Sequence, residues 1–177
     1  MRTIQDNYNR FLEVYNQWEI ALKMYSDDQI CQPTSVDSWT IGQVYNHLIQ
    51  SVTEFQAPAI LACLNSKKDV FTNKNIKGVL VFKVLNKFPP AKIKVPASDD
   101  YTPKAPKSKK EVSEGMLQVL DLMSKLKDQI ASTSSGKTPH PAFGYLNAEE
   151  WYQLIVMHWV HHLRQKKELD KVLFSNQ

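Results

Sequence analysis

Hydrophobic residues recur at alternating steps of four and three along four stretches of this chain, which is the spacing of one face of an α-helix. The stretches cover about residues 3–25, about 41–64, 112–130 and 151–169. They predict four long amphipathic helices. The seam residues are, in chain order, Ile4, Tyr8, Phe11, Tyr15, Trp18, Leu22, Tyr25; Ile41, Val44, Leu48, Val52, Phe55, Ile60; Val112, Met116, Val119, Met123, Leu126, Ile130; Trp151, Ile155, His158, His162, Gln165, Leu169.

Start signals precede the last three of these helices. In a capping box, a Ser or Thr (or Asn) is followed three residues later by Glu or Gln, and each side chain binds the other's backbone N–H. The matching pairs are Thr40 with Gln43, Ser108 with Glu111, and Asn147 with Glu150. Within the second helix, Gly42 permits a close backbone contact and Pro58 predicts a bend. Residues 26–39 and 131–146 are rich in turn formers and are expected to be loops.

The middle of the chain is the least regular part. Apolar residues between 76 and 88 predict a short extra helix that ends at Pro89 and Pro90, and the proline-rich residues beyond it predict an extended crossover. A long crossover means that the two helices it joins need not be antiparallel. With no strands expected, the fold class is all-α: a four-helix bundle, in one domain over residues 1–177, whose crossover between helices 2 and 3 carries a short helix.

Composition agrees with a globular protein. The chain has 177 residues, of which 42% are hydrophobic, and no apolar run approaches the ~20 residues of a membrane span. The start of the chain is polar and lacks the apolar core of a signal peptide, so we expect a cytoplasmic protein without a membrane partner. Cys31 and Cys63 are then expected to be free thiols.

Positive charge is concentrated in the middle of the chain. Residues 66–110 contain twelve lysines and three aspartates, a local charge of +9, whereas the rest of the chain sums to −5. Such a segment can hold nucleic acid or anionic lipid. It contains no arginine and few aromatic residues, so we interpret it as a solvated, lysine-rich stretch and expect no nucleic-acid partner.

Two histidines occupy seam positions of the last helix, where leucine or isoleucine is usual. His158 and His162 are four residues apart and therefore lie on the same face, so their imidazoles can converge on one ion. His47, at the edge of the second helix's apolar stripe, supplies a third imidazole. Three protein ligands with one open position are typical of catalytic zinc sites. The alternative is that these histidines are ordinary core residues with satisfied nitrogens.

Three sequence motifs resemble those of a known family. They are W-T-I-G-Q-V-Y-N-H-L at residues 39–48, H-P-A-F-G-Y-L-N-A-E-E-W at 140–151 and H-W-V-H-H-L-R-Q at 158–165. The first and the third resemble the two signatures of the DinB-like superfamily, which includes the YfiT-type metal-dependent hydrolases. The second resembles an uncharacterised bacterial sub-branch of that superfamily. The resemblance implies a four-helix bundle that binds zinc, nickel or a similar divalent ion through His47, His158 and His162.

Further polar residues are expected around this site. Many DinB-like chains follow the last histidine with Arg-Gly-Gln, whereas this chain has Leu163, Arg164 and Gln165. Gln165 is placed to orient a ring or a bound water, and Arg164 either pairs an acidic substrate group or lies in solvent. His161 is a competing ligand or a partly exposed neighbour, and His140, between two prolines, either lines the mouth of the site or stiffens a turn.

A divalent ion on three neutral imidazoles activates either water, for hydrolysis, or a thiol, for transfer to an electrophile. The resemblance implies both reactions. The sequence contains no HEXXH arrangement and few acidic residues near the site, which favours a low-molecular-weight thiol and a small-molecule substrate. The alternative is a non-catalytic metal-binding or dimerising bundle, and a homodimer fits both interpretations.

Overall fold

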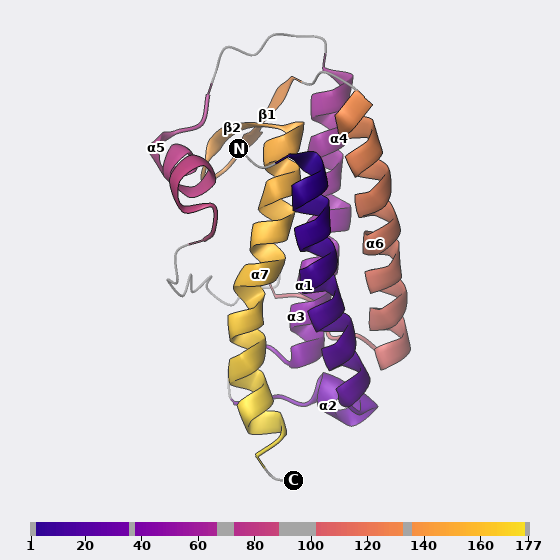
Figure 1. Ribbon diagram of the computed structural model, residues 1–177. Helices are drawn as coiled ribbons and strands as arrows, with labels where there is room; N and C mark the ends of the chain where they lie inside the picture. Colours follow the sequence, from indigo (N-terminus) through magenta and orange to yellow (C-terminus); the bar gives the residue numbers. More distant parts are fainter. Residues whose placement is uncertain (1–2, 36–37, 67–72, 89–101, 133–135, 176–177) are drawn as a thin grey trace.

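Four long helical stretches run alongside one another in the computed structural model, which describes residues 3–35, 38–66, 73–88, 102–132 and 136–175 (Figure 1). The stretches are α1 (Ile4–Met24), the continuous run of α3 (Ile41–Gln50), η1 (Ser51–Gln56) and α4 (Ala57–Asn65), then α6 (Lys109–Ser132) and α7 (Ala148–Leu173). Shorter elements join them: α2 (Asp27–Cys31), α5 (Ile76–Val79), η2 (Leu80–Leu85), β1 (Lys137–His140) and β2 (Gly144–Asn147). The predicted all-α bundle with an extra helix between its second and third members is confirmed.

The four stretches pack as a ring of neighbours. Helix α1 contacts α6 and α7, and the α3–α4 stretch contacts the same two helices from the other side. The α3–α4 stretch and α6 run in the same direction (Figure 1), because the connection between them crosses the length of the bundle. This parallel pair agrees with the long crossover expected from the sequence. Most of that crossover, residues 89–101, lies outside the described residues.

The seams predicted from the hydrophobic spacing form the core. Most of the seam side chains are buried, and Trp18 and Trp151 are completely inaccessible to solvent. Phe55 is the one seam residue that is exposed, because 47% of its surface is accessible while the next residue, Gln56, is buried. The reason is the wide π-helical turn η1, which rotates the helix face before Pro58. Proline has no N–H for the carbonyl four residues back, and its ring crowds that carbonyl.

The predicted helix starts are present. Thr40 with Gln43 and Asn147 with Glu150 each form both bonds of a capping box. Ser108 accepts from the backbone N–H of Glu111, but the Glu111 carboxylate accepts from Lys107 instead of Ser108. Each cap satisfies N–H groups that have no partner within the helix, so these side chains fix where the bundle helices begin.

Two segments expected to be loops contain regular structure. Residues 26–39 include α2, which begins with a capping box of Ser26 and Gln29. Residues 131–146 include most of an antiparallel hairpin, in which Lys137 pairs with Asn147 and His140 with Gly144. The expectation of no strands was wrong because these strands are four residues long and show no alternation of buried and exposed residues.

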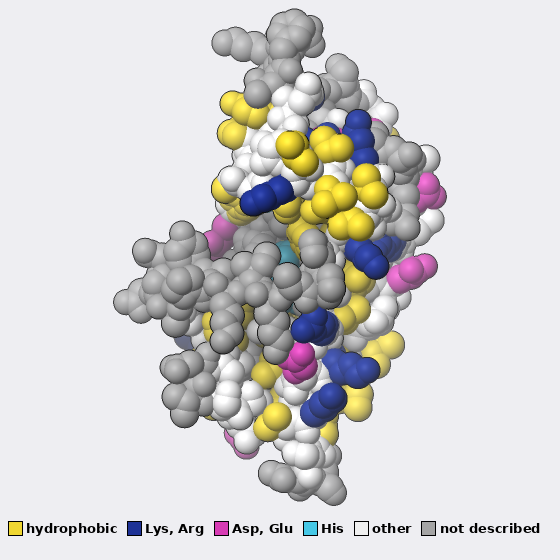
Figure 2. Space-filling view, turned by 90° about the vertical axis from the view of Figure 1, so that its left-hand side faces the viewer, with side chains coloured by type: hydrophobic (Ala, Val, Ile, Leu, Met, Phe, Trp, Pro, Cys, Tyr) yellow, Lys and Arg dark blue, Asp and Glu magenta, His cyan; other side chains and the backbone are white. Residues whose placement is uncertain are grey.

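Segment 73–88 lies outside the bundle and is attached to the end of the bundle where α7 begins (Figure 1). Lys74 forms a buried ion pair with Glu150 in the first turn of α7, and Gln153 donates to the side chain of Asn86 and to the carbonyl of Phe82. Figure 2 looks onto this face, where a histidine side chain is visible from outside. The segment therefore lies beside the part of α7 that leads to the histidines.

Two further expectations concern cysteines and membranes. Cys31 is exposed and Cys63 is buried, and both are free thiols. None of the described helices is both long enough and apolar enough to cross a membrane.

Candidate metal centre

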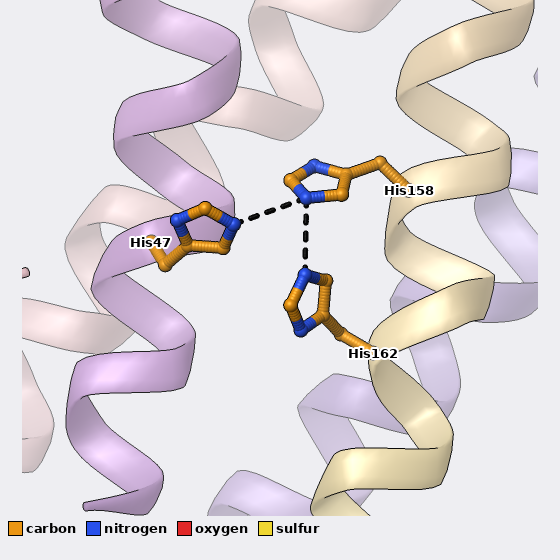
Figure 3. Close-up of side chains that lie close together, drawn as sticks. All are labelled: His47, His158 and His162. Atoms are coloured by element: carbon orange, nitrogen blue, oxygen red, sulfur yellow. Dashed lines mark hydrogen bonds between the residues drawn. The ribbon is translucent and has the colours of Figure 1, made fainter. Parts of the chain in front are cut away.

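Three histidines from two helices converge on one point. His47 lies in the last turn of α3, one turn before the π-helical stretch, while His158 and His162 lie on successive turns of α7 and face it (Figure 3). The Nε2 atom of His158 is 3.0 Å from the Nε2 atom of His47 and 3.0 Å from that of His162. The ligand atoms of all three residues lie within 4.8 Å of one another.

This arrangement fits a bound cation better than a set of hydrogen bonds. The Nε2 atom of a neutral histidine has either one proton or one lone pair, so His158 cannot form two good hydrogen bonds with it at once. A cation placed between the rings would accept a lone pair from each. Zinc–nitrogen bonds of about 2.0 Å in a tetrahedron separate the nitrogens by about 3.3 Å, close to the observed spacing. The residues present therefore fit a divalent metal ion.

Gln165 determines which nitrogen of His162 carries the proton. Its Oε1 atom lies 2.8 Å from Nδ1 of His162 and can only accept, so Nδ1 donates and Nε2 keeps its lone pair toward the other rings. Metal-binding histidines typically have such a partner on the second ring nitrogen. The buried Nδ1 atom of His158 has no hydrogen-bond partner among the described residues.

All three rings are held in the neutral form that binds metal. Burial lowers the pKa of His47 to about 4. Burial, together with the nearby His47 and His161, lowers the pKa of His162 to about 3 despite its bond to Gln165. Burial and the neighbouring imidazoles also hold the pKa of His158 well below its usual value. Near neutral pH each ring offers a lone pair, so binding an ion requires almost no loss of protons.

Aromatic side chains flank the three rings. The indole of Trp39 packs on His47 with ring centroids 5.1 Å apart. Phe88, at the end of segment 73–88, presents its ring edge-on to His158 and to His161, with centroids 6.4 and 5.6 Å apart. These apolar neighbours remove water from the sides of the rings, which explains why burial dominates the pKa shifts.

The other predicted site residues lie outside the group of three. His161 is partly buried, packs against Phe88 and His162, and is not part of the converging group. Arg164 is exposed and pairs with Glu168 one turn along α7. His140 lies in the hairpin, where it contacts Phe143, Trp151 and Phe55. Phe143 in turn stacks on Phe88, whose ring packs on His158.

Two residues beside the rings were not assigned to the site from the sequence. Trp39 opens the first sequence motif without an assigned role, and its ring packs on a histidine of the group. Its position eight residues before His47 in the same motif is a signal that could have indicated this contact. Phe88 carried no such signal, because only the folded path of segment 73–88 brings it to α7.

The fold and the three rings define a class of protein: a four-helix bundle with a three-histidine group between its second and last long helices. Within that class, the chain belongs to the DinB superfamily, whose family profile matches residues 10–165. This range includes all three histidines and Gln165. Comparison with curated proteins and with solved structures gave no match to this chain.

Proposed function

We propose that this protein is a metal-dependent enzyme in which His47, His158 and His162 hold one zinc or nickel ion through their Nε2 atoms. The convergence of three neutral imidazoles at one point, with His158 within 3.0 Å of both neighbours, carries this proposal. Membership of the DinB superfamily supports it. Three ligands leave at least one coordination position for a substrate.

The donor set favours thiol chemistry over hydrolysis. The three histidines are neutral, so an ion that they held would keep its double charge and would lower the pKa of a bound water or thiol. Hydrolysis usually also needs a general base, yet no Asp or Glu among the described residues belongs to the histidine group. A thiol needs less help, because its pKa is already near 8.5. We therefore infer transfer of a low-molecular-weight thiol to a small electrophile, with hydrolysis as the second candidate.

The surrounding residues have separate roles in this proposal. Gln165 fixes the protonation state and orientation of the His162 ring. Trp39 and Phe88 form apolar walls that exclude water from the sides of the rings. His161 lies at the edge, where its ring contacts Phe88 and His162.

Metal content is the decisive measurement. Protein purified without an affinity tag should contain about one equivalent of a divalent ion, or take up one equivalent of zinc or nickel. The variants His47→Ala, His158→Ala and His162→Ala should each lose it. His161→Ala and His140→Ala are matched controls, since both histidines lie nearby but outside the converging group. If the wild type cannot be loaded, or if the controls lose metal equally, the site assignment is wrong.

Activity separates the two reactions. The loaded protein is assayed for transfer of glutathione or cysteine to a chromogenic aryl halide, and for hydrolysis of p-nitrophenyl acetate, with His162→Ala as the metal-free control. Thiol transfer that depends on the metal supports the proposal. Metal binding without either activity would favour a non-catalytic metal-binding bundle.

A further inference from the structure

Segment 76–85 exposes apolar side chains on its outer side. Eleven large hydrophobic side chains are exposed in the described part of the chain, and five of them lie within these ten residues. Ile76 is 88% exposed and Val84 is 68% exposed, and the others are Val79, Leu80 and Leu85. In Figure 2 yellow side chains gather at the level of α5 and η2. One short segment thus holds nearly half of the exposed large hydrophobic residues.

The inner side of the same segment is packed in a fixed position. Gly78, Val81 and Phe82 are buried, and a side chain at Gly78 would meet the carbonyl of Phe143 at 2.4 Å. The buried ion pair of Lys74 with Glu150 anchors its beginning. A helix that is apolar on all sides is normally covered on all sides. Since the inner side is already occupied, the outer apolar residues are those that no other described part of the chain covers.

The charged residues of this segment all have the same sign. Residues 73–88 contain four lysines and no acidic residue. Lys77, Lys83 and Lys87 are exposed, whereas Lys74 pairs with Glu150. From the sequence we expected a solvated lysine-rich stretch, but a purely solvated segment has no physical reason to expose five large apolar side chains.

We propose that the face formed by Ile76, Val79, Leu80, Val84, Leu85 and the three exposed lysines, here called the outer face, binds the surface of an anionic phospholipid bilayer. Apolar side chains flanked by lysines are typical of helices that lie in the membrane interface, with the lysines at the level of the acidic headgroups. The protein does not span the bilayer; it rests on it.

Two other possible occupants of the outer face are a second copy of this chain and nucleic acid, and each fits it less well. A second copy joined through the same face would bring two segments of like charge together, which is unfavourable. Nucleic acid would match the charge but offers no apolar layer for Ile76 and Val84. The segment that carries the outer face ends at Phe88, whose ring packs inward on Phe143 and His158.

Vesicle co-sedimentation tests this proposal with the full chain. Vesicles of phosphatidylcholine alone are compared with vesicles of equal parts phosphatidylcholine and phosphatidylserine, at low and at high salt. We expect binding to the anionic vesicles only, weakened by salt. The double variant Ile76→Gln/Val84→Gln should lose it, and Lys77→Gln/Lys83→Gln/Lys87→Gln should weaken it on the order of a hundredfold, about fivefold per lysine.

Matched controls use residues on other faces. Leu117→Gln removes a 57%-exposed leucine of α6, and Lys171→Gln removes an exposed lysine of α7. Both should bind like the wild type, and all variants should keep the circular dichroism spectrum and metal content of the wild type. Equal binding to both kinds of vesicle, or equal loss in the controls, overturns the proposal. It is also overturned if the wild type ignores vesicles but dimerises in sedimentation equilibrium through Ile76 and Val84, because a second copy then covers the outer face.

Discussion

Removing Gln165 tests whether the orientation of the His162 ring matters for metal binding, because Gln165 contacts that ring without being a ligand itself. It touches Nδ1 of His162 at 2.8 Å and is not itself in the converging group. Gln165→Ala should lower zinc affinity about 10–100-fold, because the His162 ring loses the acceptor that fixes its proton on Nδ1. Gln165→Glu, which keeps an acceptor, should retain the affinity. The measurement is competition with a chromophoric chelator.

The neighbouring Arg164 provides the control for that experiment. Its side chain is exposed and pairs with Glu168, so Arg164→Ala removes a residue of the same turn that is not in the converging group. Its zinc affinity should equal that of the wild type. Equal losses in Gln165→Ala and Arg164→Ala would mean that the bond to His162 has no orienting role.

His140 should make the hairpin region sensitive to acid. Burial lowers its pKa from 6.5 to about 4, and its Nδ1 accepts a hydrogen bond from the N–H of Ala142 that protonation would break. Because the unfolded chain then binds the proton first, the contribution of His140 to the free energy of unfolding is complete above pH 6.5. It is lost progressively as the pH falls toward 4.

The test compares urea unfolding of wild type and His140→Gln, without metal, near pH 7 and near pH 5. The variant should lose less stability between the two conditions. The rings packed around His140 belong to Phe55, Phe143 and Trp151, which do not titrate, so the difference reports on His140 itself. The three converging histidines also have lowered pKa values, but they contribute equally in both proteins. Identical pH dependence in the two proteins would contradict the prediction.

At the scale of elements, two glycines in neighbouring helices predict different responses to the same change. A Cβ at Gly42, in the first turn of α3, would meet the backbone oxygen of Ile30 at 2.5 Å, whereas a Cβ at Gly115 in α6 would meet the end of the Ile49 side chain at 2.8 Å. Backbone cannot move aside as a side chain can. Gly42→Ala should therefore lower the free energy of unfolding by about 1–3 kcal/mol.

Gly115→Ala should stay within about 1 kcal/mol of the wild type, since alanine's higher helix propensity offsets the displacement of Ile49. Urea unfolding of both variants measures the difference. If the two variants lose the same free energy of unfolding, the close contact between α2 and α3 is not the reason why position 42 requires a glycine. Gly42 was identified from the sequence as a place of close backbone approach, and the structure confirms that approach.

The helices could be predicted because their hydrophobic spacing repeats over many turns. Local features that interrupt the repeat could not be. Phe55 was placed in the core, but the π-helical turn η1 rotates it outward, and that turn depends on how the chain accommodates Pro58. The hairpin was missed because pairing of Lys137 with Asn147 depends on long-range geometry, and strands of four residues carry too little pattern.

The same distinction applies to the candidate metal centre. His158 and His162 were predictable because the i, i+4 spacing of a helix already places them together. His47 was a candidate from its place at the edge of the second helix's apolar stripe, but only the family resemblance implied that it meets the other two, since spacing within one helix does not say which other helix faces it. Phe88 depended on the path of segment 73–88, which the ion pair of Lys74 with Glu150 fixes only in the folded chain.

At the scale of the whole molecule, the candidate centre joins helices that are far apart in the sequence. His47 and His158 are separated by 111 residues and belong to the second and the last long helix. The unfolded chain does not hold them together, so an ion binds mainly the folded state and stabilises it. Metal binding should therefore be visible as a change in global stability as well as in metal content.

At a free zinc concentration about a hundredfold above the dissociation constant, zinc binding should raise the free energy of unfolding by about 2.7 kcal/mol. For a chain of this length, that change corresponds to a rise of about 5–10 °C in the melting temperature.

His162→Ala should show no rise, because it lacks one of the three ligands. His161→Ala should show the full rise, because the ring of His161 lies beside the group without joining it. Differential scanning fluorimetry with and without zinc compares each protein with itself, so changes in metal-free stability cancel. A rise of the same size in His162→Ala and wild type would show that zinc stabilises the fold from somewhere other than the three converging rings.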